Sequence, residues 1–156
     1  MKQRGANIKK IIIILLPLAW MAMIFYLSHQ PAEQSAELSG GIVANLIEIF
    51  HLPVTEHFVR KAAHFSEYAV LGILVVNAVR LFVSNHFLWT SVVVCSLYSV
   101  TDELHQLFIP GRSCQVSDML LDTAGSAAGV LLWWLVICLM KKRKQVLRDK
   151  DEEGLH

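Results

Sequence analysis

The chain has 156 residues, enough for one domain, and 54% of them are hydrophobic whereas only 17% are charged. This balance excludes an ordinary soluble globular protein and indicates a membrane protein. The formal net charge of +1 hides a segregation of basic residues into two short terminal clusters, which is typical of membrane topology signals and argues against a nucleic-acid-binding protein.

These basic clusters predict the orientation of the chain. Lys9 and Lys10 precede the first apolar stretch, and Lys-Lys-Arg-Lys at residues 141–144 follows the last one. Cytoplasmic loops carry an excess of Lys and Arg, so both termini are expected in the cytoplasm. Between residues 27 and 59 there is no Lys or Arg but there are four Glu, as a translocated loop should have.

Four apolar stretches approach the length of about 20 residues that a helix needs to cross the hydrocarbon core. They are residues 11–27, 59–83, 87–108 and 116–140. No convincing cleavage site follows the first stretch, so it is expected to remain as an anchor. The sequence therefore predicts an all-α polytopic membrane protein of four transmembrane helices, with one membrane domain over residues 1–145 and a disordered cytoplasmic tail over residues 146–156.

A further helix is expected outside the membrane, over residues 35–50. Its apolar residues recur at helical spacing, with polar residues between them. They are Leu38, Ile42, Leu46, Ile49 and Phe50. This pattern favours an amphipathic helix lying on the outer interface, broken or bent near Gly40 and Gly41, over a mobile lid.

Ionisable and polar residues gather at the outer ends of the second, third and fourth spans. Spacings of three and four residues place each group on one face of its helix. The groups are Lys61, His64, Glu67 and Tyr68; Asp102, His105 and Gln106, with Glu103 next to Asp102 in the chain; and Asp118 and Asp122. The three spans alternate in direction, so every group occupies the outer end of its helix. His64, Asp102 and Asp122 are expected on the order of 5 to 10 Å below the outer boundary. The sequence thus predicts one polar pocket that is open to the cell exterior.

Two features follow from small and turn-forming residues. Ile109-Pro110-Gly111-Arg112 is typical of a tight turn. It places Arg112 at the mouth of the pocket, where the guanidinium could bind phosphate or carboxylate or pair with Asp118, Glu103 or Asp102. Gly125 and Gly129 form a GxxxG pattern, for which close packing within the molecule is expected.

Taken in order, these motifs resemble the VanZ family of membrane proteins over about residues 60–129. The matching motifs are Lys61-x-x-His64-Phe65-x-x-Tyr68, Asp102-Glu103-x-His105-Gln106, Pro110-Gly111-Arg112, Asp118, Asp122 and Gly125. The resemblance implies a small multi-span protein of the bacterial cytoplasmic membrane, with a role in the cell envelope and a link to resistance to the lipoglycopeptide teicoplanin. It implies no catalytic assignment, so the residue roles below rest on their chemistry.

One hypothesis is an enzyme, a hydrolase or transferase, that acts on an anionic lipid-linked or cell-wall head group. Histidines would act as acid or base, oriented by carboxylates. The catalytic candidates are His64, Glu67, Asp102, Glu103, His105 and Asp122. The candidates for substrate binding are Lys61, Tyr68, Gln106, Arg112 and Asp118. There is no obvious Ser or Cys nucleophile beside a histidine, so attack would come from water or a second substrate.

Three alternatives remain open beside this enzyme. The same residues could capture or shield a lipid-linked head group or a lipoglycopeptide without catalysis, or they could form a structural network between helices. A divalent metal such as Zn²⁺ is a variant of the enzyme, although nearby Lys61 and Arg112 would repel a cation. Its ligands would be His64, Glu67, Asp102 and His105. Membrane lipids are expected partners in every case, and the residues do not decide whether the protein is an enzyme.

Overall fold

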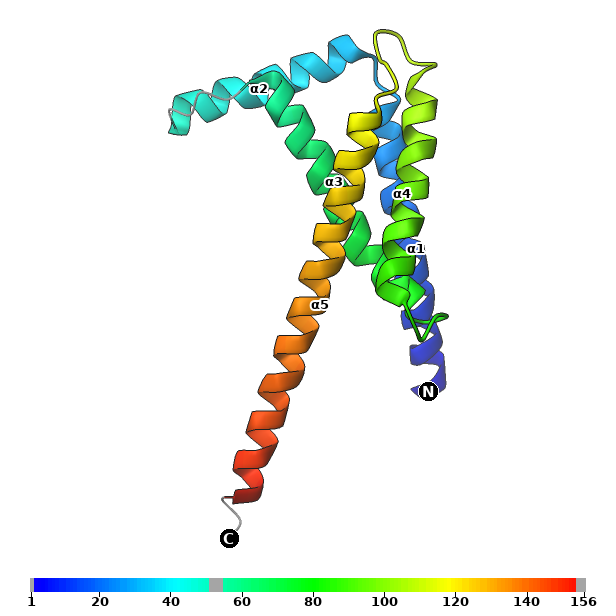
Figure 1. The fold of residues 1–156 in the computed structure, drawn as a ribbon, viewed down its shortest axis with the longest axis vertical. Helices are drawn as coiled ribbons and strands as arrows, with labels where there is room; N and C mark the ends of the chain where they lie inside the picture. The colour runs from blue at the N-terminus through cyan, green and yellow to red at the C-terminus, as the bar shows by residue number, and fades with distance from the viewer. Residues whose placement is uncertain (1, 51–54, 154–156) are drawn as a thin grey trace.

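A computed structural model describes residues 2–50 and 55–153 of the chain (Figure 1). It contains five helices, α1 (Lys2–Ser28), α2 (Ala32–Phe50), α3 (Glu56–Val79), α4 (Phe87–Gln106) and α5 (Val116–Glu153). Helices α1, α3, α4 and α5 form a bundle, and α2 projects sideways from one end of it (Figure 1). The all-α prediction is confirmed.

Three of the helices are long and apolar enough to cross a membrane: Gly5–Ser28, Glu56–Val79 and Val116–Asp149. Helix α4 occupies the third predicted span and has 20 residues, but serines, threonines and two carboxylates make it less apolar. Large apolar side chains remain exposed on the bundle surface, as with Leu15 at 56% and Leu131 at 61%. A multi-pass membrane protein places such side chains against lipid tails.

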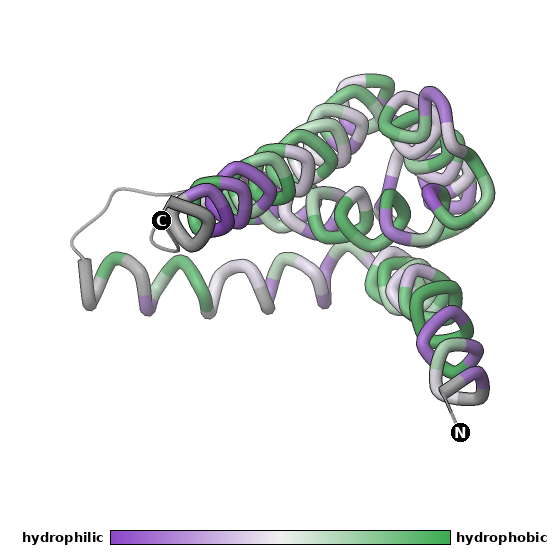
Figure 2. Tube along the Cα trace, turned by 90° about the horizontal axis from the view of Figure 1, so that it is seen from below, coloured by the Kyte–Doolittle hydropathy of each residue, from purple (hydrophilic) through white to green (hydrophobic). Residues whose placement is uncertain are grey.

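The two ends of the bundle differ in character. The chain begins and finishes at one end, here called the terminal end (Figure 1). Residues 29–31 and 107–115 join helices at the opposite end, here called the loop end. Viewed along the bundle, the apolar stretches of α1 and α5 give way to hydrophilic turns close to the termini (Figure 2). Helices α3 and α5 run in the same direction, from the loop end toward the terminal end (Figure 1).

Glycines bring α3 and α5 into backbone contact. Each of three glycines lies so close to the opposite helix that an added Cβ would overlap a backbone carbonyl. The pairs are Gly125 with Phe65, Gly129 with Ala69, and Gly72 with Ser126. The GxxxG surface therefore packs within the molecule, as predicted.

Helix α1 is held against α3 and α4 by a small apolar core and by two polar contacts. The buried core consists of Ile24, Tyr68, Leu71, Val75 and Cys95. Trp20 Nε1 donates to the carbonyl of Glu67 at 2.9 Å. Tyr98 Oη donates to the carbonyl of Met21 at 2.6 Å. These contacts fix the end of α1, which then contributes to the site.

Helix α2 differs from the predicted interfacial helix in two respects. It begins at Ala32, three residues earlier than expected, and it continues through Gly40 and Gly41 without the expected break. A helical glycine costs about 1 kcal/mol but does not force a break. The side chain of Ile42 is 50% exposed. The other side chains of the predicted apolar face, Leu38, Leu46, Ile49 and Phe50, lie outside those that the structure describes.

The end of α5 also differs from the prediction. Helix continues to Glu153, through most of the segment that was expected to be a disordered tail from residue 146. Residues 145–153 contain Lys, Arg, Gln and Glu, which are good helix formers, and neither Gly nor Pro interrupts them. The remaining part of that predicted tail, residues 154–156, lies outside the described residues.

Candidate functional site

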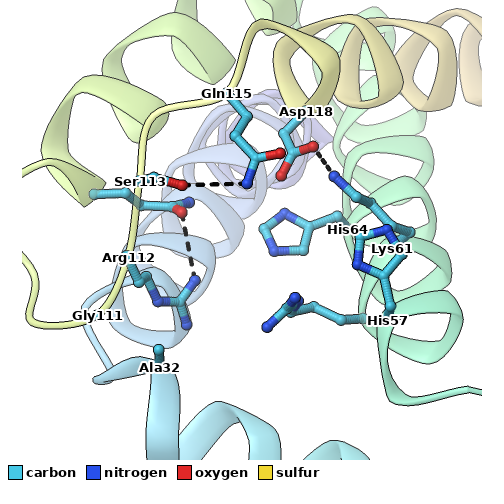
Figure 3. A pocket seen from close by; sticks show the side chains of 11 residues that line it. Ala32, His57, Lys61, His64, Gly111, Arg112, Ser113, Gln115 and Asp118 are labelled. Carbon is cyan, nitrogen blue, oxygen red and sulfur yellow. Dashed lines mark hydrogen bonds and ion pairs between the residues drawn. The ribbon is translucent and has the colours of Figure 1, made fainter.

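A cavity of about 80 Å³ opens at the loop end, where the first turns of α3 and α5 meet the 107–115 loop (Figure 3). Five of the predicted site residues line it: Lys61, His64, Gln106, Arg112 and Asp118. The other lining residues are Ala32, His57, Arg60, Gly111, Ser113 and Gln115. Among the described residues, three basic side chains, two histidines and a single carboxylate thus line the cavity. The site favours an anion.

The basic side chains come from one face of α3. Thr55 caps this helix, accepting a hydrogen bond from the backbone N–H of Phe58 at 3.2 Å. Capping starts the helix just ahead of the polar run, and residues three and four apart then share a face. His57, Lys61 and His64 therefore lie on successive turns beside the cavity (Figure 3).

Two acid–base pairs join α3 to α5. Lys61 Nζ forms an ion pair with Asp118, and both side chains are partly exposed. One turn deeper, His64 Nδ1 lies 3.8 Å from Asp122 Oδ1. Both of these atoms are buried, and neither has a hydrogen-bond partner within the described part of the chain. The other Asp122 oxygen accepts from Ser99 Oγ at 2.8 Å, which holds the carboxylate toward His64.

Arg112 closes the opposite wall of the cavity. Its Nε donates to the carbonyl of Gln30 at 2.8 Å, and Nη2 donates to the carbonyl of Leu27 at 3.4 Å. Its Nη1 donates to the side-chain oxygen of Gln106 at 3.5 Å. Burial, with a smaller contribution from Arg60, lowers the pKa of the Arg112 guanidinium, but an arginine remains charged at neutral pH. The charge is therefore held in place at the mouth.

The tight turn before Arg112 forms as predicted. Gly111 has φ of 75°, a conformation that glycine adopts at little cost. The carbonyl of Pro110 accepts a hydrogen bond from the backbone N–H of Ala32 at 3.2 Å. The loop is thereby fastened to the start of α2.

Two further predicted residues, Asp102 and Glu103, are buried behind the cavity and do not line it. Asp102 Oδ2 accepts from Ser28 Oγ at 2.9 Å, and Glu103 Oε2 accepts from the backbone N–H of Gln115 at 2.9 Å. These contacts tie α4 to α1 and to the 107–115 loop. Each carboxylate keeps a second, buried oxygen with no protein partner.

Tyr68 is fully buried in the core, where its ring lies 6.2 Å from that of Tyr98. Its hydroxyl is buried without a hydrogen-bond partner. Tyr68 therefore lies too deep to line the cavity.

His105 does not join His64. Its Nε2 lies 3.1 Å from Nδ1 of His29, and its ring stacks on Phe25 with 4.4 Å between centroids. The reason is that α1 covers this face of α4, a tertiary contact that helical spacing alone does not reveal. The expected pairing of the two histidines in one pocket is not what the structure shows.

The residues of the metal alternative are likewise separated. Within residues 2–50 and 55–153, no three His, Cys, Asp or Glu side chains are grouped as a metal site requires. His64 faces Asp122, Asp102 faces Ser28, and His105 faces His29.

A second cavity, of about 260 Å³, adjoins the first between α3, α2 and the end of α1. Glu67, the remaining candidate, lies in its wall. The full lining is Leu27, Ser28, Gln30, Ser35, Ser39, Ile42, Val59, Arg60, Ala63, His64, Glu67 and Arg112. The two cavities share Arg60, His64 and Arg112.

Several of these lining residues were absent from the predicted site. His57 and Arg60 precede Lys61 and His64, respectively, by four residues, so the same helical spacing could have identified them. The contributions of Ser28 and Gln30 had no such signal, because they depend on how α1 packs.

Helical architecture, lipid-facing apolar surfaces and a polar site at one end define a multi-pass membrane protein with a cation-lined cavity. The VanZ/LLP1 family model matches residues 13–138, and the chain belongs to this family. The match covers most of α1 and all of α2, and so extends beyond the segment of residues 60–129 that carries the motif resemblance. No curated protein and no solved structure matches the chain.

Proposed function

We propose that α1, α3, α4 and α5 all cross the membrane as one domain over residues 1–145, with both termini in the cytoplasm. Helices α3 and α5 run in the same direction, so a chain that crosses in both must return through α4. The 20 residues of α4 rise about 30 Å, the thickness of the hydrocarbon core. The Lys-rich residues 141–144 favour a cytoplasmic terminal end. The loop end and α2 then lie at the outer interface.

In this orientation the protein binds the anionic head group of a lipid, with phosphate as the anion that the donors suit best. One observation carries this proposal: Arg60, Lys61 and Arg112 face one small cavity in which Asp118 is the only carboxylate among the described lining residues. Partly buried cations gain strength from the low local dielectric, and guanidinium and ammonium groups are the usual ligands of phosphate.

The contribution of one such contact can be estimated. A hydrogen bond to a charged group contributes about 1.5–3 kcal/mol, so losing one weakens binding roughly 10- to 150-fold. Because Lys61 and Asp118 form an ion pair, substituting one or the other should change the affinity for the anion in opposite directions. Removing Lys61 takes away a donor, whereas neutralising Asp118 frees that donor and removes a repulsive charge.

The experiment is native mass spectrometry of the purified protein with phosphatidate, and with phosphatidylcholine as the zwitterionic lipid. Lys61→Gln should lower phosphatidate binding by at least about tenfold. Asp118→Asn should raise it. Lys141→Gln is the matched control, because it removes the same charge at the terminal end. If Lys61→Gln and Asp118→Asn change binding in the same direction, the ion pair is merely structural and the proposal is wrong.

A second candidate is hydrolysis at the bound head group. It is favoured by the two unpartnered buried atoms, His64 Nδ1 and Asp122 Oδ1, which face each other at 3.8 Å. A carboxylate that accepts a hydrogen bond from Nδ1–H fixes the tautomer in which Nε2 can take a proton from water, and such distances often shorten when substrate binds. The side chain of His64 projects into the cavity (Figure 3).

Phosphate release from phosphatidate tests this candidate. His64→Gln and Asp122→Asn should each lower the rate by about 10²–10⁴-fold while phosphatidate still binds. If the wild-type protein binds phosphatidate but releases no phosphate from it, hydrolysis is excluded and the protein only binds the lipid.

We also propose that the protein contributes to teicoplanin resistance, which its family membership supports. A protein that holds lipid-linked head groups at the outer interface would alter how a lipoglycopeptide reaches its target. Expression in a susceptible strain should raise the minimum inhibitory concentration of teicoplanin, and Lys61→Gln should abolish the increase. An equal increase in the minimum inhibitory concentration with the wild-type protein and with Lys61→Gln would show that resistance does not depend on the cavity.

A further inference from the structure

The two cavities at the loop end differ in chemistry and meet at shared residues. The smaller cavity is surrounded by the cations of α3 and the 107–115 loop, whereas the larger one exposes more apolar than polar surface, although Ser28, Gln30 and Glu67 also line it. Arg60, His64 and Arg112 belong to both. A cationic cavity beside a more apolar one matches the two parts of an amphiphile, an anionic end and a hydrocarbon end.

Apolar side chains from three helices form part of the walls of the larger cavity. Leu27 comes from α1, Ile42 from α2, and Val59 and Ala63 from α3. Serines 35 and 39 of α2 lie on the same side as Ile42, and Ser39 Oγ donates to the carbonyl of Ser35 at 2.9 Å within its own helix. The Ser39 donor is therefore satisfied internally and does not require a polar ligand.

We propose that the cavity between α2 and α3 holds the first part of one hydrocarbon chain of the lipid whose phosphate occupies the cation-lined cavity. The proposal rests on the function proposed above and adds the substrate class: a lipid phosphate in which one chain begins next to the anion. Helix α2 then determines specificity, because it forms one side of the chain site.

The volume supports a single chain. About 260 Å³ is near the lower limit of roughly 300 Å³ for small-molecule sites. It accommodates a short stretch of one chain and not a whole lipid. The remainder extends past α2 into the surrounding bilayer, where it meets no barrier from water.

Photoaffinity labelling tests this placement. The protein is reconstituted in phosphatidylcholine nanodiscs and irradiated with dodecyl phosphate that carries a diazirine near the phosphate end of its chain. Adducts are expected on peptides that contain Leu27, Ile42 and Val59, and an excess of unmodified dodecyl phosphate should remove them. Ethyl phosphate, which has the same head group and almost no chain, should compete far less well.

Two isoleucines on α2 provide matched variants. Ile42 lines the cavity and is 50% exposed, whereas Ile47 does not line it and is 46% exposed. Ile42→Trp should fill the chain site and reduce labelling about tenfold, since even one methylene in an apolar pocket is worth about 10-fold or more. Ile47→Trp should leave labelling unchanged. Ala63→Leu narrows the same cavity from α3, and it replaces Ile42→Trp if that variant does not fold.

The possible outcomes separate this inference from the proposed function. If phosphatidate binding depends on Lys61 but the adducts lie on the outer surface of α4 or α5, the chain site is wrong and the head-group site stands. If no phosphate-bearing probe binds in a Lys61-dependent manner, both are wrong. The inference is supported if the probe labels the cavity, Ile42→Trp abolishes this labelling, and Ile47→Trp leaves it unchanged.

Discussion

The contact between α3 and α5 makes the sharpest prediction about stability. Replacing Gly129 with Ala adds a methyl group where the backbone carbonyl of Ala69 already lies. Backbone atoms cannot rotate away as a flexible side chain can, so the two helices must separate by on the order of 1 Å. The surrounding glycine contacts, Gly125 with Phe65 and Gly72 with Ser126, would loosen at the same time.

The magnitude follows from the packing. A gap of about 0.5–1 Å forfeits roughly a quarter to a half of the dispersion attraction of each atom pair it separates. Overpacking of this kind costs about 1–3 kcal/mol. Gly129→Ala should therefore lower the free energy of unfolding by about 1–3 kcal/mol, measured by titration with SDS in mixed micelles.

The same substitution elsewhere provides the control. An added Cβ at Gly5 meets no atom within 4 Å, so Gly5→Ala should be neutral or slightly stabilising. The substitution should also affect the cavity, because Lys61 and Asp118 lie on the two helices that separate. Gly129→Ala should weaken phosphatidate binding. Equal stability of Gly129→Ala and Gly5→Ala would refute the close contact and the packing that aligns the cavity walls.

Three further predictions follow from other contacts. Arg112→Lys should lower the free energy of unfolding by about 1–3 kcal/mol, because one ammonium cannot replace three separate guanidinium contacts. An unchanged free energy of unfolding in the same SDS titration would contradict this. An impermeant maleimide added to intact cells should label Cys114 in the 107–115 loop and spare the buried Cys95, whereas labelling of Cys114 only after lysis would place the loop end inside. Trp133→Phe should cost about 0.5–1.5 kcal/mol through loss of the 3.1 Å hydrogen bond to Asn77, and an unchanged unfolding titration would count against that bond.

Elements with a strong local pattern were predicted well. Long apolar stretches located the helices to within a few residues at most ends, and the small size of Gly125 and Gly129 predicted close packing against another helix, which the structure identifies as α3. The tight turn at Gly111 followed from the conformational freedom of glycine. In each case the cause lies within a few residues of chain, which is why sequence reasoning reached it.

Features that depend on tertiary packing were predicted less well. Equal depth along the helices predicted that Lys61, His64 and Asp118 share one end of the bundle, and these three residues line one cavity. It did not show that α1 would cover α4, which turns His105 toward His29 and Asp102 toward Ser28. A residue's depth along a helix follows from counting, whereas the direction it faces depends on which neighbour packs against it.

The same distinction explains the end of α5. A disordered tail was predicted from residue 146, but strong helix formers without Gly or Pro continue the helix to Glu153. The side chains of residues 146–149 are exposed, so intrinsic helix propensity decides the conformation there.

The central claim is that the cations at the loop end bind a lipid phosphate. Its most direct test is the affinity for phosphatidate of two double variants that lose the same charge at opposite ends of the protein, Arg60→Gln with Lys61→Gln, and Lys141→Gln with Lys142→Gln. The first pair should lose about 100-fold or more, from two contacts of at least ~1.4 kcal/mol each, while the second should stay within a few-fold of wild type. Equal losses in both pairs would mean that the basic residues attract anionic lipid only in general, and would contradict the claim.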